Sequence, residues 1–214
     1  MLISHRHHFI IFPDPLESCH WIRRALAPWV DQSVASRQES KGKTAFFDGM
    51  TPSEVAAAFA RDGRDFDAYA RIAIVQNPYL RMAQLYDKIS DQDPVWRFKE
   101  RLGVPKPLFD DWLQSTRPSG NGAGNALSPR WRRHAAWSAD EWCDGRIDHV
   151  IRAENAMTDL QRVFRKLGIA PAFRCRSTDQ HELQKRTIDR YASRSIATMR
   201  KRYRSDLNML SDHA

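Results

Sequence analysis

Cysteine, glycine and long apolar runs are all scarce in this chain of 214 residues. The three cysteines, Cys19, Cys143 and Cys175, are widely spaced and odd in number, which argues against a disulfide framework or a zinc site. We therefore expect reduced thiols and no bound metal. The 9 glycines and 11 prolines are too few for a collagen-like or low-complexity chain. The protein is expected to fold.

Apolar runs, such as those at residues 9–12 and 55–60, extend over only a few positions. A membrane-spanning helix needs about 20 mostly apolar residues, so we expect no membrane span. The apolar start of the chain is broken at residues 5–8 by His-Arg-His-His, which argues against a secretory signal peptide. We expect a cytoplasmic location.

Acidic residues are in the minority, because 26 of them face 34 lysines and arginines, for a net charge of +8. This excess favours anionic partners such as phosphates, sulfates, nucleic acid or acidic lipid. Hydrophobic residues make up 42% of the chain, enough at this length for one sizeable core. We predict a single domain over residues 1–214, with the glycine-rich segment 116–129 as an exposed, mobile loop.

Three segments of the chain follow the order buried strand, turn, helix. The strands are expected at residues 7–12, 72–75 and 147–151. The helices are expected from Cys19, from Pro78 after an Asn77 cap, and from Ala156 to Leu167 with Gly168 as the C-terminal cap. Such repeated units predict an α/β fold with a parallel sheet flanked by helices.

Two further helices are predicted by local patterns. Thr51-Pro52-Ser53-Glu54 combines a hydroxyl cap, a proline at the first helical position and a Glu that can reach back, so a helix is expected through about Arg61. Apolar residues at helical spacing predict another helix over residues 191–210.

In an open parallel sheet, ligands bind beyond the carboxyl ends of the strands, where helix N-termini present free backbone N–H groups. The turns at residues 13–20 and 76–79 follow the first two predicted strands. These turns are therefore the first candidates for a ligand site.

Several stretches carry a more specific pattern: residues 5–26, Val75-Gln76-Asn77-Pro78-Tyr79-Leu80-Arg81 with Leu85-Tyr86, Asp148 to Leu160, and Tyr203 with Asp206 and Leu207. On these residues the chain resembles bacterial sulfotransferases related to carbohydrate sulfotransferases. The resemblance implies a single-domain, P-loop-kinase-like sulfotransferase fold. It also implies that 3'-phosphoadenosine 5'-phosphosulfate (PAPS) donates a sulfonate to a hydroxyl of a saccharide or similar acceptor.

The resemblance also assigns the residues of the nucleotide site. The implied cofactor-binding positions are Pro15, Leu16, Ser18, Cys19, Gln76, Asn77, Arg81, Gln84, Arg174 and Arg176. The family has a lysine, an arginine and a serine where this chain has Leu16, Gln76 and Gln84. Aligning the first turn on Pro13 instead places Asp14 at the lysine, so the lysine is absent in either frame. Arg174 or Arg176 could replace the contact that Gln76 cannot make.

Two side chains are candidates for the catalytic base that takes a proton from the acceptor hydroxyl. His20, just inside the first helix, carries an imidazole suited to general-base chemistry near neutral pH. Glu17, in the preceding turn, is the alternative.

The replaced positions leave two function hypotheses open. A hydrogen bond to a charged group contributes roughly 1.5–3 kcal/mol, so losing the Lys and Arg contacts removes about 3–6 kcal/mol of nucleotide binding. The chain is thus expected either to be a PAPS-dependent sulfotransferase or to be a catalytically inactive sulfotransferase-fold protein that serves as a binding or assembly subunit with a protein partner. Nucleic acid, which charge alone suggests, is the least favoured partner.

Overall fold

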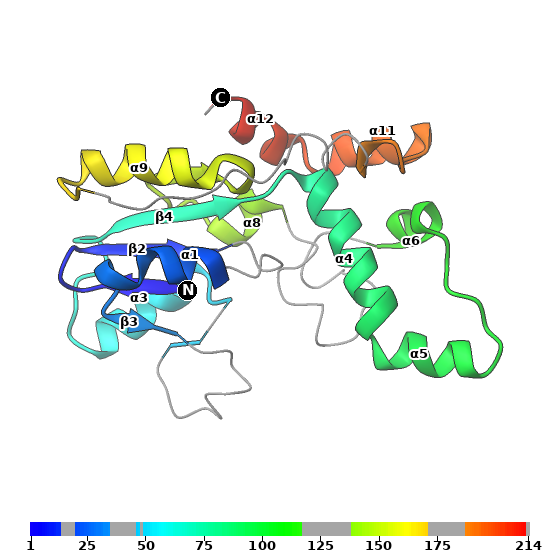
Figure 1. The fold of residues 1–214 in the computed structure, drawn as a ribbon, viewed down its shortest axis with the longest axis horizontal. Coiled ribbons are helices and arrows are strands. Elements are labelled where there is room, and N and C mark those ends of the chain that lie inside the picture. The colour runs from blue at the N-terminus through cyan, green and yellow to red at the C-terminus, as the bar shows by residue number, and fades with distance from the viewer. Residues whose placement is uncertain (14–19, 35–45, 48, 117–137, 171–186, 213–214) are drawn as a thin grey trace. The chain divides into compact units, whose positions relative to one another are not determined.

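The computed structural model describes residues 1–13, 20–34, 46–47, 49–116, 138–170 and 187–212 (Figure 1). The chain forms two compact units. The first consists of residues 1–76 and 142–176, and the second of residues 77–141 and 177–212. The prediction of one domain over residues 1–214 stays a prediction.

The first unit is built on a mixed β-sheet. Its strands are β1 (Leu2–Ser4), β2 (Phe9–Phe12), β3 (Gln32–Ser33), β4 (Ala70–Val75) and β5 (His149–Arg152). Within the described ranges these five strands form one sheet in the order β3-β1-β2-β4-β5. β2, β4 and β5 run parallel, as predicted, whereas β1 pairs antiparallel with both β2 and β3. The predicted α/β class is confirmed, but the sheet is not wholly parallel.

The antiparallel edge exists because residues 5–8 form a turn rather than the beginning of a strand. The turn places His8 at φ 49°, and the Asp31 carboxylate accepts hydrogen bonds from the backbone N–H groups of His5 and Arg6, at 2.7 and 2.9 Å. β2 therefore begins at Phe9 instead of residue 7. The first residues of the chain fold back beside it as β1.

One face of the sheet packs against α1 (His20–Leu26) and α9 (Ala156–Lys166). The core on this face comprises Leu2, Phe9, Ile11, Ile22, Leu26, Ile72, Ile74, Ile151, Ala156, Leu160, Val163, Phe164 and Ile169. After α1 the chain makes one turn of 3-10 helix, η1 (Ala27–Trp29), and α9 is preceded by a second, η2 (Ala153–Asn155). Gly168 ends α9 at φ 72°, and the N–H of Ile169 reaches back to the carbonyl of Phe164 at 2.8 Å, which confirms the predicted glycine cap.

Helix α3 (Pro52–Arg61) begins and ends where its sequence predicts. The Thr51 hydroxyl accepts from the Glu54 N–H at 3.3 Å, and the Glu54 carboxylate accepts from the Thr51 N–H at 2.8 Å. This capping box satisfies N–H groups that the first turn of a helix leaves without partners.

The second unit is helical in the part of it that the structure describes. It contains α4 (Pro78–Gln92), α5 (Pro94–Arg101), α6 (Phe109–Ser115), most of α8 (Ala139–Cys143), α11 (Ser193–Arg202) and α12 (Arg204–Asp212). The single helix predicted over residues 191–210 is thus two helices, because the backbone leaves helical geometry at Tyr203, with φ −114° and ψ 30°. No described helix is long and apolar enough to cross a membrane. Apart from Thr116, the predicted loop 116–129 lies outside the described residues.

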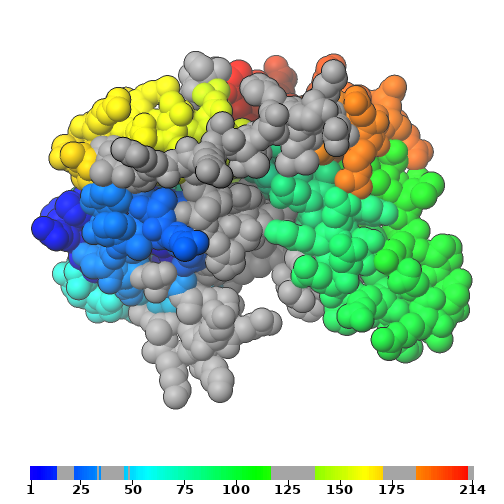
Figure 2. All heavy atoms as spheres, viewed as in Figure 1, coloured from blue at the N-terminus to red at the C-terminus, as the bar shows by residue number. Residues whose placement is uncertain are grey.

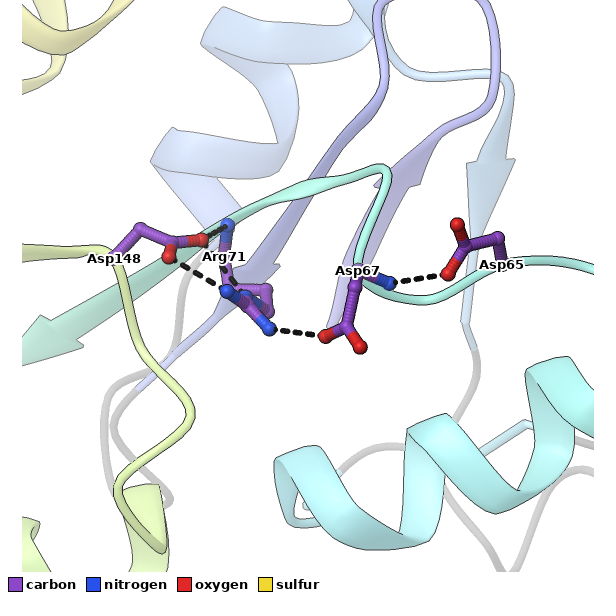
Figure 3. Close-up of polar contacts among 4 residues, drawn as sticks. All are labelled: Asp65, Asp67, Arg71 and Asp148. Carbon is purple, nitrogen blue, oxygen red and sulfur yellow. Dashed lines mark hydrogen bonds and ion pairs between the residues drawn. The ribbon is translucent and has the colours of Figure 1, made fainter.

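An ion-pair network fixes the amino ends of β4 and β5 (Figure 3). The Arg71 guanidinium donates to both carboxylate oxygens of Asp148, at 2.8 and 2.7 Å, and to Asp67 at 2.6 Å. The Arg71 N–H also donates to Asp148, and the Asp148 N–H donates to the Arg71 carbonyl. Hydrogen bonding from Arg71 holds the pKa of Asp148 below its usual value. The network joins the start of β5 to the start of β4.

We expect Asp148→Asn to lower the free energy of unfolding by about 1 kcal/mol near neutral pH, since this bidentate pair is only partly exposed. The folded-state pKa of Asp148 is depressed, so its contribution is present above the unfolded value of 3.8 and is lost as pH falls through the folded pKa. Urea unfolding at several pH values measures this: the gap between wild type and variant should shrink in acid. Asp91→Asn, at an exposed position on α4, is the matched control. If the difference in unfolding free energy between wild type and Asp148→Asn does not change with pH, the pair with Arg71 is not its cause.

Candidate functional site

The carboxyl ends of β2, β4 and β5 meet at one edge of the sheet in the first unit, which is where an open α/β sheet binds ligands. β2 leads through Pro13 toward α1, β4 ends next to Gln76, and β5 leads into η2 and α9. This carboxyl edge of the parallel strands is the candidate site.

Many of the residues predicted from the sequence to form the site lie outside the described residues. They are Pro15, Leu16, Glu17, Ser18 and Cys19 in the first turn, and Arg174 and Arg176 farther along the chain. His20 is the first residue of α1, and its side chain is not described. The roles of these residues in nucleotide binding and proton transfer stay predictions.

Gln76 is the predicted site residue that the structure places directly at the carboxyl edge. Its side chain is 5% exposed, and its Oε1 has no hydrogen-bond partner among the described residues. The alternation along β4 puts it on the same face as Ile72 and Ile74, the face that α1 and α9 cover. A buried acceptor without a partner costs about 1–3 kcal/mol, so such an oxygen is a place to look for a ligand that donates a hydrogen bond.

Arg152, the last residue of β5, supplies a cationic group at the same edge. Its Nε lies 3.4 Å from Asp159 Oδ2, and its backbone N–H donates to the same oxygen at 3.3 Å. With the Asn155 amide turned so that both of its polar atoms are satisfied, the amide oxygen accepts from Arg152 Nη2 at 2.9 Å. The buried Asp159 and the start of α9 therefore hold this guanidinium in a defined position.

Arg152 was not among the residues predicted to bind a ligand, although Arg152-Ala153-Glu154-Asn155 formed part of the resemblance. The signal that could have identified it is its position at the end of the third predicted parallel strand, where the sheet rule expects ligand contacts. Pairing with Asp159 depends on how η2 turns the chain into α9, which the sequence pattern does not specify.

The remaining predicted residues belong to the second unit, because the boundary between the units falls between Gln76 and Asn77. The Asn77 side chain accepts from the Tyr79 N–H at 3.0 Å and so caps α4, as its sequence predicts. Gln84 is half-buried on α4. The Asn77 cap and the partial burial of Gln84 do not by themselves indicate that either residue binds a ligand.

Arg81 is fully buried inside the second unit. Its Nη2 lies 3.2 Å from Asp206 Oδ2, and its guanidinium lies over the Tyr203 ring, 5.3 Å from the centroid. Asp206 also accepts from the Ala139 N–H at 2.8 Å, so the pair joins α4, α8 and α12. Burial raises the pKa of Tyr203 to about 12. This environment favours a structural role for Arg81 over the predicted phosphate contact.

No three His, Cys, Asp or Glu side chains are grouped in a way that could hold a metal ion within the parts of the chain that the structure describes. Comparison of the chain with models of known protein families, with curated proteins and with solved structures gives no match. Any assignment of function therefore depends on the chain's own residues and their geometry.

We expect Arg81→Met to lower the free energy of unfolding by about 3–5 kcal/mol, because it leaves the Asp206 carboxylate buried without its cation. Urea unfolding measures the loss. Adding Asp206→Asn should recover part of it, and Arg200→Met, on the exposed surface of α11, should change little. Should Arg81→Met be as stable as wild type and lose only nucleotide binding, the structural role is wrong.

Proposed function

We propose that this protein is a sulfotransferase-like domain that binds a phosphoadenosine nucleotide at the carboxyl edge of β2, β4 and β5. The observation that carries the proposal is the buried, unpartnered Oε1 of Gln76 at the end of β4. The parallel order of the three strand–helix segments and the resemblance to bacterial sulfotransferases support the same site.

The described side chains at this edge are suited to different chemical groups of a phosphoadenosine nucleotide. The Gln76 oxygen can accept a hydrogen bond from a ribose hydroxyl or from the adenine amine, but it cannot accept one from an ionised phosphate, which carries no donor. Arg152 provides a guanidinium, the group best suited to a phosphate. A ligand that combines hydroxyl or amine donors with a phosphate carries a partner for each residue.

The N-terminus of α9 adds to this preference. Asn155 makes no side-chain capping bond at the start of the helix, and a helix N-terminus carries a partial positive charge. An anionic group beside Arg152 would gain from this charge as well as from the guanidinium.

Sulfonate transfer is the reaction that the resemblance implies for this site. PAPS supplies a sulfonate that passes to an acceptor hydroxyl, with adenosine 3',5'-bisphosphate as the leaving group. In this proposal Gln76 and Arg152 hold and orient the nucleotide, and His20 or Glu17 takes the proton of the hydroxyl. The acceptor is a saccharide or a similar polyhydroxy compound.

A second candidate function is that of a non-catalytic binding or assembly subunit with the same fold. The neutral Gln76 favours it, because the sulfotransferase motif has a phosphate-binding arginine at this position. Arg81, which the chain retains, is paired with Asp206. At the edge described, Arg152 is also partly neutralised by Asp159. A site of this kind would still bind a nucleotide, but it would lack the positive charge that accelerates sulfonate transfer.

Calorimetric titration with adenosine 3',5'-bisphosphate tests the nucleotide site. We expect Gln76→Leu to weaken binding several-fold while raising the free energy of unfolding by about 1 kcal/mol, because it removes a buried oxygen that has no partner in the free protein. Arg152→Gln should weaken binding roughly 10- to 100-fold, as expected for one charge-assisted hydrogen bond. Arg165→Gln, at an exposed position near the end of α9, is the charge-matched control.

Two outcomes overturn this assignment. One is the absence of binding by the wild-type protein at millimolar nucleotide, a concentration that still detects a contact of about 4 kcal/mol. The other is binding by Gln76→Leu and Arg152→Gln that equals wild type, which would move the nucleotide to another part of the chain.

Incubation with radiolabelled PAPS and a panel of saccharides tests transfer. We expect label on an acceptor to depend on enzyme concentration and to fall in Arg152→Gln as nucleotide affinity falls. Nucleotide binding without label on any acceptor supports the non-catalytic subunit instead. In that case Gln76→Arg should tighten binding, because it restores the cationic residue of the motif.

A further inference from the structure

A row of large apolar side chains is exposed on the second unit, on α5 and the segment that follows it. Val95, Phe98, Leu102, Val104 and Leu108 are 49%, 61%, 65%, 48% and 72% exposed. Val95, Phe98 and Leu102 recur at the spacing of one helix face. We call these five residues the α5 apolar stripe.

The stripe is presented by a well-anchored element. Asp93 accepts from the N–H groups of Val95 and Trp96, at 2.9 and 3.2 Å, which caps the start of α5. Trp96 is buried on the opposite side of the helix, 5.8 Å from the Tyr86 ring. At the far end the Val104 N–H bonds to the Lys99 carbonyl at 3.0 Å. The exposure is therefore a feature of the folded helix and not of a frayed end.

Basic residues alternate with the apolar residues of the stripe along the chain. Between residues 94 and 108 the chain has Arg97, Lys99, Arg101 and Lys106 against the single acidic residue Glu100, so this short segment carries a net charge of +3. Arg97, Lys99 and Arg101 are exposed, and Lys106 lies 3.3 Å from Glu100. A second copy of the chain would bring the same positive charge, which opposes self-association through this face.

The shape of this region helps to decide between the two remaining kinds of partner, a peptide and a lipid surface. α5 lies at the end of α4 remote from α11, and its surface bulges outward as part of the green lobe in Figure 2. The stripe lies on the outer, convex side of a helix and is exposed, so it fits a flat, deformable surface better than it fits a groove-binding peptide. Apolar side chains inserted at the headgroup level, with lysines and arginines beside them, are the pattern of proteins that lie on anionic membranes.

We propose that the α5 apolar stripe and its basic neighbours dock the protein on the surface of an anionic lipid bilayer. Phe98 and Leu102 enter the headgroup region, while Arg97, Lys99 and Arg101 contact lipid phosphates and carboxylates. This surface lies wholly within the second unit and does not depend on the proposed nucleotide site.

Co-sedimentation of the full chain with vesicles tests the docking surface. We expect binding to vesicles of equimolar phosphatidylcholine and phosphatidylserine and little binding to pure phosphatidylcholine. The double variant Phe98→Ser with Leu102→Ser should bind at least about tenfold more weakly, because two inserted side chains are removed. Arg97→Gln with Lys99→Gln should lose most of the preference for anionic vesicles.

The controls make the same chemical changes away from the stripe. Ile188→Ser removes another exposed apolar side chain, and Arg200→Gln with Lys201→Gln removes two exposed charges from α11. All substituted positions are exposed, so circular dichroism should show folded variants. Vesicle binding that is absent in wild type, or equally strong in the stripe variants, overturns the proposal. So does concentration-dependent dimerisation in ultracentrifugation that Phe98→Ser with Leu102→Ser abolishes, since the stripe would then be a self-association surface.

Discussion

The register between β4 and β5 is the constraint on which the candidate site depends. After β4 the chain runs through the residues 77–141 of the second unit before β5 begins, so no short turn sets how the two strands align. The bidentate pair of Arg71 with Asp148 fixes the amino ends, and the ladder then carries that alignment from Ile72 and His149 to Val75 and Arg152. A slip of one residue would turn every side chain of β5 to the other face of the sheet. Local charge at one edge of the sheet thus favours the alignment that places Val75 and Arg152 at the opposite edge.

Sequence patterns predicted those parts of the fold that depend on residues close together in the sequence. The capping box of α3, the Asn77 cap and the Gly168 terminus each depend on a few consecutive residues, and all three are found. The parallel strands were predicted because their apolar runs are bounded by turns. β1 and β3 were not, because strands of three and two residues carry no periodic signal, and Gln32 is polar. Their pairing depends instead on a turn stabilised by Asp31, which is distant in sequence from the residues that it binds.

The candidate site could be predicted only in part for a related reason. The end of a strand is visible in a sequence, so Gln76 was correctly placed at the carboxyl edge. The partner of a buried cation is not visible when it is far along the chain. Asp206 lies 125 residues after Arg81, and only the folded unit reveals that its carboxylate pairs with the arginine inside the protein. Arg152 at the candidate site is a similar case, because its guanidinium is held by Asp159 and by the turn through η2, and the sequence pattern specifies neither contact.

The two proposed surfaces use positive charge in different ways. At the carboxyl edge, Arg152 lies beside Asp159, so the local field is weak and recognition must depend on hydrogen bonds with defined directions. Between residues 94 and 108 the chain has four basic residues and one acidic residue, and the exposed Arg97, Lys99 and Arg101 can act on a broad anionic surface. Charge on a flexible, exposed side chain suits a fluid membrane, whereas a guanidinium held by two neighbours suits one small ligand. Binding at the edge should therefore respond to the shape of the ligand more than to salt, and binding through α5 should respond to salt and to the net charge of the headgroups more than to which anionic headgroup carries that charge.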